Sequence, residues 1–469
     1  MFTRRQALAT TACGFGSLAF NAMASAAASP LVARKGHHPA KAKRVIFLFM
    51  AGGVSQVDSF DYKPKLAEMH GRSMEFDDAR IVAKTGMGAA QRLMQSLWPH
   101  QQRGESGHWA SDLFPHMASM VDDLTFIHSM HTEGVAHGPS TIFMHTGSTA
   151  FVRPSMGAWV SYGLGTENDN LPAFVTLSPS MGNGGPRNYG TAFLPPVYQG
   201  TALGRAGMPA TEASIRNVNN DLIPMAQRQR QFEFLRQLNQ AQLDRSSAIA
   251  PDPEAEAVLN SYELAWRLQQ NAPETFDISG ESAHTLALYG IGPGLASDNY
   301  GRQCLMARRL AERGVRYIQV NYSDNTNNPA WDQHSNMPKH ADHAAAVDRP
   351  VWALVQDLKQ RGLLEDTIVW WGGEFGRTPY AQSNGTGRDH NPGGFTVWMA
   401  GGGFQSGLAY GATDDFGHMA IKDKVHMHDL HATILHQLGL DHEKLTYRHA
   451  GRDFRLTDVH GQVVKGLLG

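Results

Sequence analysis

The sequence predicts an α/β fold: a doubly wound, mostly parallel sheet flanked by helices, with a helical insertion. Short apolar runs recur along the chain and end at glycine or polar residues, as expected for strands buried on both faces of a sheet. Helical patterns separate several of these runs, which is typical of doubly wound sheets. We therefore expect functional residues at the carboxyl ends of the strands, where loops converge.

The first strand is expected at residues 45–50, where the apolar run VIFLFM is followed by Gly52 and Gly53. Further strands are expected at residues 125–128, 173–177, 315–321, 367–371 and 396–400. Helices are expected at residues 299–314 and 344–362, the second ending at Gly362 as a C-cap.

The chain is longer than one simple core usually holds, which predicts either one large α/β domain carrying an insertion or two domains. The α/β domain is expected in two parts, residues 44–210 and 296–469. Between them, residues 211–295 change to long polar helices, at about 225–244 and 253–271. We interpret this insertion as a structural cap beside the sheet.

The amino terminus has the pattern of a twin-arginine export signal. Arg4 and Arg5 precede an uncharged, Ala- and Gly-rich stretch within residues 1–28, and residues 29–43 are typical of a flexible leader. We expect cleavage and release by the twin-arginine export machinery into the periplasm or the medium. The alternative is a membrane anchor, but nothing downstream has the apolar length of a stable span.

Composition narrows the chemistry further. After removal of the signal, Cys304 is the only cysteine, so no internal disulfide can form. A formal net charge of -2 gives no reason to expect a nucleic acid partner. The chain has 23 histidines, many beside Asp, Gly or Pro in apparent loops, which favours metal or acid–base chemistry.

Polar residues follow the predicted strands at one edge of the sheet. They are Ser55, Gln56, Asp58, His131, His137, Asp332, His334, Glu374, Arg377, Asp389 and His390. Each has an ordinary structural alternative: Asp58 as a helix cap, His137 bonded to a carbonyl, Glu374 paired with Arg377. Asp332 and His334 are two residues apart, so in an extended segment both side chains can hold one ion.

Four motifs carry a family resemblance that covers nearly the whole chain. They are GEFGRTP at 373–379, GRDHNP at 387–392, WDQHSN at 331–336 and HDLHAT at 428–433. Together they resemble the twin-arginine-exported, sulfatase-like family called domain of unknown function fifteen-oh-one. That family in turn is similar to the alkaline phosphatase and sulfatase superfamily of metal-dependent ester hydrolases, which implies an alkaline phosphatase-like fold.

The superfamily resemblance implies a set of metal ligands. Asp332, His334 and His390 correspond to the ligands of one ion, and Glu374 to a carboxylate on a second ion. Phe375 stands where a histidine ligand is expected. Glycines occupy the place of the sulfatase Asp pair after the first strand, and Asp58 is the nearest replacement.

The same resemblance places His137 at the nucleophile position, within HGPST at residues 137–141. Formylglycine chemistry therefore has no precursor residue here. Three roles remain open for His137: a metal ligand that replaces the one missing at Phe375, a nucleophile, or a hydrogen-bonded core residue. His426 or His428, at the start of a predicted helix, is a further candidate close to the site, whereas His431 and His436 are expected to be structural.

These features predict a hydrolase of phosphate or sulfate esters with metal-bound hydroxide as the attacking group. One or two divalent ions are expected, zinc or manganese, with Arg377 holding an anionic oxygen of the substrate. The alternative is a non-catalytic metal-containing protein that binds an anionic ligand such as a polysaccharide.

Overall fold

The computed structural model describes most of the chain after residue 30. The described residues are 31–76, 91–168, 170–213, 223–247, 259, 262–263, 266, 275–323, 328–382 and 386–469. The predicted signal, residues 1–28, lies outside them, as does most of the predicted helix at 253–271.

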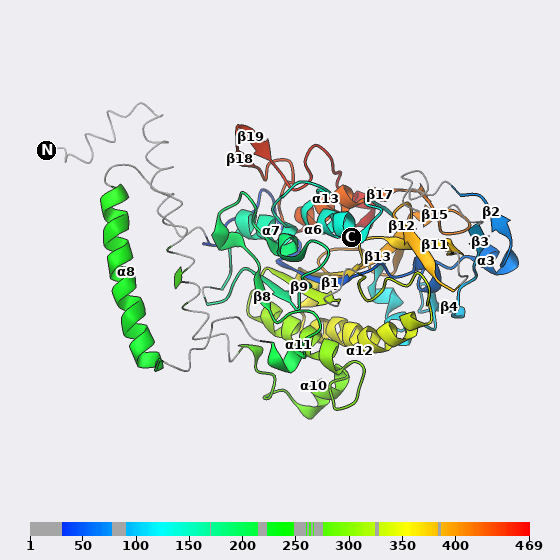
Figure 1. Cartoon of the computed structure of the whole chain (residues 1–469), viewed down its shortest axis with the longest axis horizontal. Coiled ribbons are helices and arrows are strands. Elements are labelled where there is room, and N and C mark those ends of the chain that lie inside the picture. Colours follow the sequence, from blue (N-terminus) through cyan, green and yellow to red (C-terminus); the bar gives the residue numbers. More distant parts are fainter. Residues whose placement is uncertain are drawn as a thin grey trace.

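A nine-stranded sheet forms the centre of the molecule (Figure 1). Its strands lie in the order β14-β6-β13-β10-β1-β9-β7-β8, with β17 also paired to β6. Their bounds are Arg44–Met50 (β1), Thr125–His131 (β6), Phe174–Leu177 (β7), Thr201–Leu203 (β8), Tyr317–Tyr322 (β9), Thr367–Gly372 (β10), Phe395–Ala400 (β13), Leu408–Tyr410 (β14) and Val425–His426 (β17).

The sheet is largely parallel, as predicted. Strand β1 pairs in parallel with β10 on one side and β9 on the other, and β7 and β8 continue that direction. Strand β13 is the exception, because it runs antiparallel to both β10 and β6. The carboxyl ends of β1, β9 and β10 therefore meet at one edge.

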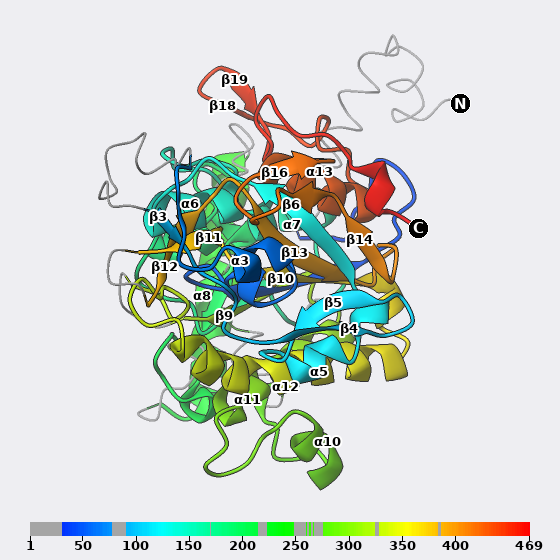
Figure 2. The same ribbon diagram turned by 90° about the vertical axis from the view of Figure 1, so that its right-hand side faces the viewer.

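Helices cover both faces of the sheet (Figures 1 and 2). Alternate residues of β1 enter two separate cores, with Ile46, Leu48 and Met50 in one and Val45, Phe47 and Phe49 in the other. The first core contains α11 (Asp298–Glu312) and α12 (Lys339–Gln360). The second contains α6 (His137–Thr146), α7 (Met156–Leu164) and α13 (Met427–Gln437).

All six strands that the sequence predicts are present, with ends that differ by a few residues at most. Helix α12 begins at Lys339, five residues earlier than expected, immediately after Pro338. A second, four-stranded sheet was not predicted: β12 (Arg388–Asn391), β11 (Gly376–Ala381), β3 (Gln91–Leu93) and β2 (Ser73–Met74). Its strands are short and polar, so they lack the apolar runs that identify buried strands.

Residues 31–43, expected as a flexible leader, have ordered contacts with the domain. Leu31 is buried, and backbone hydrogen bonds join Arg34 to Leu164 and His38 to Gly439. In the predicted insertion, α8 (Met225–Ser247) stands beside the α/β body (Figure 1). Among the residues that the structure describes, no helix combines the length and apolar character needed to cross a bilayer.

Candidate metal centre

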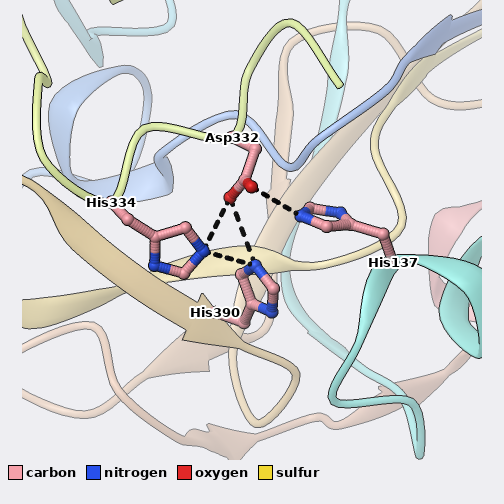
Figure 3. Close-up of side chains that lie close together, drawn as sticks. All are labelled: His137, Asp332, His334 and His390. Atoms are coloured by element: carbon pink, nitrogen blue, oxygen red, sulfur yellow. Dashed lines mark hydrogen bonds and ion pairs between the residues drawn. The ribbon is translucent and has the colours of Figure 1, made fainter. Parts of the chain in front are cut away.

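Four side chains converge at the carboxyl edge of the central sheet (Figure 3). They are His137, Asp332, His334 and His390, and one potential ligand atom from each lies within 4.8 Å of the others. His137 is the first residue of α6, Asp332 and His334 lie in the loop between β9 and α12, and His390 is on β12. Three distant parts of the chain thus supply one cluster.

The outward nitrogen of His137 is held by a carboxylate. Its Nδ1 lies 2.7 Å from Oε1 of Glu374, a fully buried residue. Both oxygens of Glu374 also accept from the Gly52 amide, at 3.0 Å each. Since a carboxylate can only accept, Nδ1 of His137 carries the proton, and in a neutral ring Nε2 presents a lone pair.

The other two imidazoles are held in the same way. Nδ1 of His390 lies 2.9 Å from the carbonyl oxygen of Val135, which can only accept. Nδ1 of His334 lies 2.8 Å from Oε1 of Gln382. All three rings therefore use Nδ1 as a donor outside the cluster and direct Nε2 into it, which is how metal-binding imidazoles are commonly oriented.

The three Nε2 atoms surround the carboxylate of Asp332. Those of His334 and His390 lie 2.9 Å and 3.2 Å from its Oδ1, and 3.0 Å from each other. Nε2 of His137 is 3.2 Å from Oδ2, yet the contact lacks hydrogen-bond geometry, so this buried nitrogen has no hydrogen-bond partner. Lone pairs this close to a carboxylate repel unless a proton or a cation lies between them, and the residues present therefore fit a metal ion.

The electrostatics of the cluster follow from burial and these contacts. Burial raises the pKa of Asp332, but the three adjacent histidines and the charge of Arg377 outweigh it and hold that pKa well below its usual range. Burial lowers the pKa of His390 to about 3. For His137, burial acts in the same direction, but the adjacent carboxylates of Asp332 and Glu374 prevail and raise the pKa. Without a cation, protonation of His137 is therefore favoured over protonation of His390.

Arg377 is fully buried and positions Asp332. Its Nη2 donates to Oδ1 of Asp332 at 2.8 Å, and its Nε donates to the carbonyl of Gly53 at 3.1 Å. A further bond, from Nη1 to the carbonyl of Arg388, spans 3.2 Å. The sequence predicted that Arg377 would hold an anionic oxygen of the substrate. In the structure, its guanidinium forms hydrogen bonds with protein groups.

Phe375 and the glycines after β1 fit against each other. The Phe375 ring stacks on His390, with ring centroids 4.4 Å apart, and lies 5.1 Å from His137. A Cβ on Gly53 would be 2.8 Å from Phe375, and one on Gly52 would be 2.7 Å from the Asp332 amide. Both glycines also have positive φ, so this segment excludes the side chains that bind metal there in sulfatases.

Asp58 lies in a separate buried network. Its Oδ2 is 2.7 Å from Nε of Arg388, and its oxygens also accept from Ser55 and the Leu97 amide. Burial raises the pKa of Asp58, but the adjacent Arg388 outweighs it, so the pKa is lowered overall. The structure does not bring Asp58 into the four-residue cluster.

Two contacts of the cluster were not anticipated from the sequence. Gln382 holds His334, and the Val135 carbonyl holds His390; neither has a motif that marks it. At the start of α13, Nδ1 of His426 accepts from the His428 amide and so caps the helix. His431, predicted to be structural, is fully buried and donates from Nε2 to the carbonyl of Met144.

A family model described as "Protein of unknown function (DUF1501)" matches residues 42–468. The chain belongs to this family. The match begins two residues before β1 and includes every residue of the cluster. None of the curated proteins is a significant match to the sequence.

Several solved structures of low sequence identity resemble this DUF1501 chain. PsFucS1 sulfatase from Pseudoalteromonas sp. has a TM-score of 0.35 and 12% identity, covering 90% of this chain and 70% of its own. The phosphonate monoester hydrolase SpPMH from Silicibacter pomeroyi has a TM-score of 0.35 and 9% identity, covering 91% and 76%. A protein in the alkaline phosphatase superfamily from Vibrio parahaemolyticus has a TM-score of 0.36 and 8% identity, covering 88% and 70%.

Proposed function

We propose that this protein is an exported hydrolase of phosphate or sulfate esters that works with one divalent metal ion. The observation that carries the proposal is the arrangement of three imidazoles whose Nδ1 atoms are held from outside and whose Nε2 atoms surround one carboxylate. The motifs at 331–336, 373–379 and 387–392, which resemble those of sulfatase-like proteins, support the ester chemistry.

His137, Asp332, His334 and His390 would hold the ion. Three nitrogens and one oxygen suit zinc, with manganese as the alternative. A divalent ion held there would act as a Lewis acid. It would also lower the pKa of a bound water, so that hydroxide is available to attack an ester. Because His334 is about one-quarter exposed, substrate would approach from its side of the cluster.

Two features support one ion rather than two. Glu374 bonds to the Gly52 amide and to His137, so its role in this proposal is to orient a ligand and keep its Nε2 basic. The Phe375 ring fills the space against His390 where the superfamily resemblance implies a further ligand. We assign Arg377 the positioning of Asp332, with which it is paired.

His137 acts as a ligand in this proposal. A nucleophilic role requires a nitrogen aimed at the ester. Nδ1 of His137 is bonded to Glu374, and Nε2 faces Asp332 inside the cluster. Neither nitrogen is therefore available to attack an ester, which favours the ligand role over a phosphohistidine.

One observation favours a second candidate, a non-catalytic metal-containing protein that binds an anionic ligand. Four protein side chains could supply all four ligands of a zinc ion, as in structural zinc sites, whereas catalytic zinc usually has three protein ligands and one open position. The two candidates differ in whether the ion accepts a fifth ligand and whether esters are turned over.

The purified protein, loaded in turn with zinc and manganese, should be assayed with aryl phosphates and aryl sulfates. The hydrolase proposal expects metal-dependent turnover that is lost in His334→Ala together with metal content. His449→Ala removes an exposed histidine outside the cluster and serves as the control. Full metal occupancy without turnover of either ester class would reject the hydrolase and favour the binding protein.

We propose twin-arginine export from the Arg4-Arg5 pair and the uncharged stretch that follows. This predicts a mature amino terminus near residue 29 in the periplasmic or secreted fraction. Replacing both arginines by lysine should retain the precursor in the cytoplasm. Export of that double variant at the normal rate would exclude this route.

A further inference from the structure

A small polar cavity lies at the carboxyl ends of β9 and β7, and two of the chain segments that line it continue into the metal centre. Its walls include Ala51, which precedes Gly52, and Thr141, which lies one helical turn after His137 on α6. Gln319, Asn321 and Asn188 provide its buried amide groups. The cavity and the cluster therefore share two adjoining segments of the chain.

Gln319 and Asn321 are unusual residues for their position. They alternate along β9, pair with Phe47 and Phe49 of β1, and point to the face that is otherwise a large apolar core. Both are at least 95% buried. Burying a side-chain amide in a central strand costs free energy unless all of its polar atoms form hydrogen bonds. It therefore matters which of these atoms have a partner and which do not.

Carbonyl groups fix the orientation of these two amides. The carbonyl of Leu177 can only accept, so Asn321 presents Nδ2 to it, at 2.6 Å. Oδ1 of Asn321 then accepts from Nε2 of Gln319, at 2.7 Å. This sequence of bonds leaves Oε1 of Gln319 as a buried acceptor with no partner.

Asn188 presents a second acceptor in the same way. It lies in the short 3₁₀ helix Gly185–Tyr189 and donates from Nδ2 to the carbonyl of Asn183, at 3.1 Å. Its Oδ1 is buried and has no partner. Two separate segments therefore each place one unpaired oxygen among the residues that line one cavity.

The missing partner must donate hydrogen bonds, and its size is limited. None of the described residues that line the cavity is charged, so a neutral donor fits better than a cation. The space in which the centre of a water-sized group can lie is about 20 Å³, which is enough for one such group. A hydroxyl group is neutral, fits this volume and donates one hydrogen bond, which satisfies one of the two oxygens.

We propose that this cavity is a substrate subsite that takes a hydroxyl group from the alcohol portion of a sugar or polyol ester. The hydroxyl donates to Oε1 of Gln319 or Oδ1 of Asn188, and the ester group of the same molecule lies at the metal centre. The assignment of the bound molecule as substrate rests on the proposed hydrolase function, whereas the binding of a hydroxyl group does not.

Binding is tested first, with neutral probes that lack an ester. Saturation-transfer NMR with glycerol, glucose and galactose should detect binding of at least one probe to the metal-loaded protein. At least one of Gln319→Met and Asn188→Leu should weaken that binding about 10-fold, the effect of losing the one hydrogen bond that the hydroxyl donates to a buried group. Gln303→Met is the matched control, because Gln303 is also a buried glutamine with an unpartnered Oε1, but it lies on α11 and does not line this cavity.

No binding of any probe to the wild-type protein would overturn the proposal and leave ordered water as the occupant. Equal weakening in the Gln303 control would also overturn it, because the loss would then reflect folding. Two variants on separate segments guard against one that fails to fold.

Kinetics then test the substrate role. With glucose 6-phosphate and glucose 6-sulfate, the variant that weakens probe binding should raise KM about 10-fold. For the corresponding 4-nitrophenyl esters, which carry no aliphatic hydroxyl, its KM should change less than about twofold. An equal effect on both ester types would overturn the subsite. If sugars bind through Gln319 but no ester is hydrolysed, the hydrolase function fails and the hydroxyl site stands.

Discussion

Nδ1 of His137 donates to Glu374 across 2.7 Å, and Glu374 in turn accepts from the Gly52 amide with both of its oxygens. This carboxylate is therefore bonded to the protein on the side away from the cluster. If Glu374 only orients His137, its substitution should weaken metal binding. If Glu374 binds a second ion, its substitution should remove that ion.

Glu374→Gln should lower metal affinity about 10- to 100-fold and leave the number of bound ions at one, because it weakens the hold on His137 without removing a ligand. Metal titration and elemental analysis measure both quantities. Asp348→Asn is the matched control: Asp348 is likewise a buried carboxylate bonded to a histidine, His116, and to backbone amides, but it lies on α12 and is not part of the cluster. A fall from two bound ions to one would instead make Glu374 a ligand.

His137→Ala should lose metal content and activity together, because it removes one of four donors. His145→Ala, on the same helix, removes a ring packed between Phe47 and Phe49 and should reduce thermal stability with metal content unchanged. Full occupancy in His137→Ala, or a phosphorylated His137 after a substrate quench, would contradict the ligand role.

Metal binding should release a proton at pH values below the raised pKa of His137. The pKa of His137 is raised in the absence of a cation, and below it the protonated ring must lose that proton before Nε2 can bind an ion. Metal affinity should therefore fall as pH decreases below this raised pKa. Titration calorimetry in buffers of different ionisation enthalpy counts the protons, and a count of zero would show that the ring is already neutral.

Asp58→Asn should destabilise the fold by about 3–5 kcal/mol, the usual cost of leaving a buried charge unpaired, here Arg388. Metal content of the folded protein should not change. Denaturant unfolding of the metal-free protein separates the two effects. Asp453→Asn, which breaks an exposed pair with Arg448, should have little effect. Loss of a bound ion from the folded Asp58 variant would restore Asp58 as a ligand.

Stability should decrease in mild acid because of histidines that are buried in neutral form. Burial lowers the pKa of His145 and of His431 to about 4, against about 6.5 in an unfolded chain. Between these values the unfolded state binds more protons, so stability present above pH 6.5 is lost as pH falls towards 4. Each residue should cost about 2 kcal/mol at pH 5. His431→Gln, which can still donate to the Met144 carbonyl, should flatten the pH dependence of the unfolding free energy; an unchanged slope would count against this account.

The central sheet was predicted well because its strands are buried on both faces, and such strands are continuous apolar runs that can be recognised in the sequence. Strands β11 and β12 gave none, since residues such as Arg377 and His390 occupy them and their pairing depends on contacts across the chain. The positions of Asp332 and His334 at the sheet edge followed from their place after β9. The partners of Glu374 did not, because hydrogen bonds to residues 237 and 322 positions away have no local pattern.

The approach of the first strand's end to the Asp332 loop also limits how this site can change over evolution. A side chain at Gly52 would meet the backbone of Trp331 and Asp332 at 2.7–2.9 Å, and one at Gly53 would meet Phe375. Acidic residues at these two positions would therefore require the loop and the ring to move together. No single substitution at Gly52 or Gly53 can therefore add an acidic ligand to this centre without displacing its neighbours.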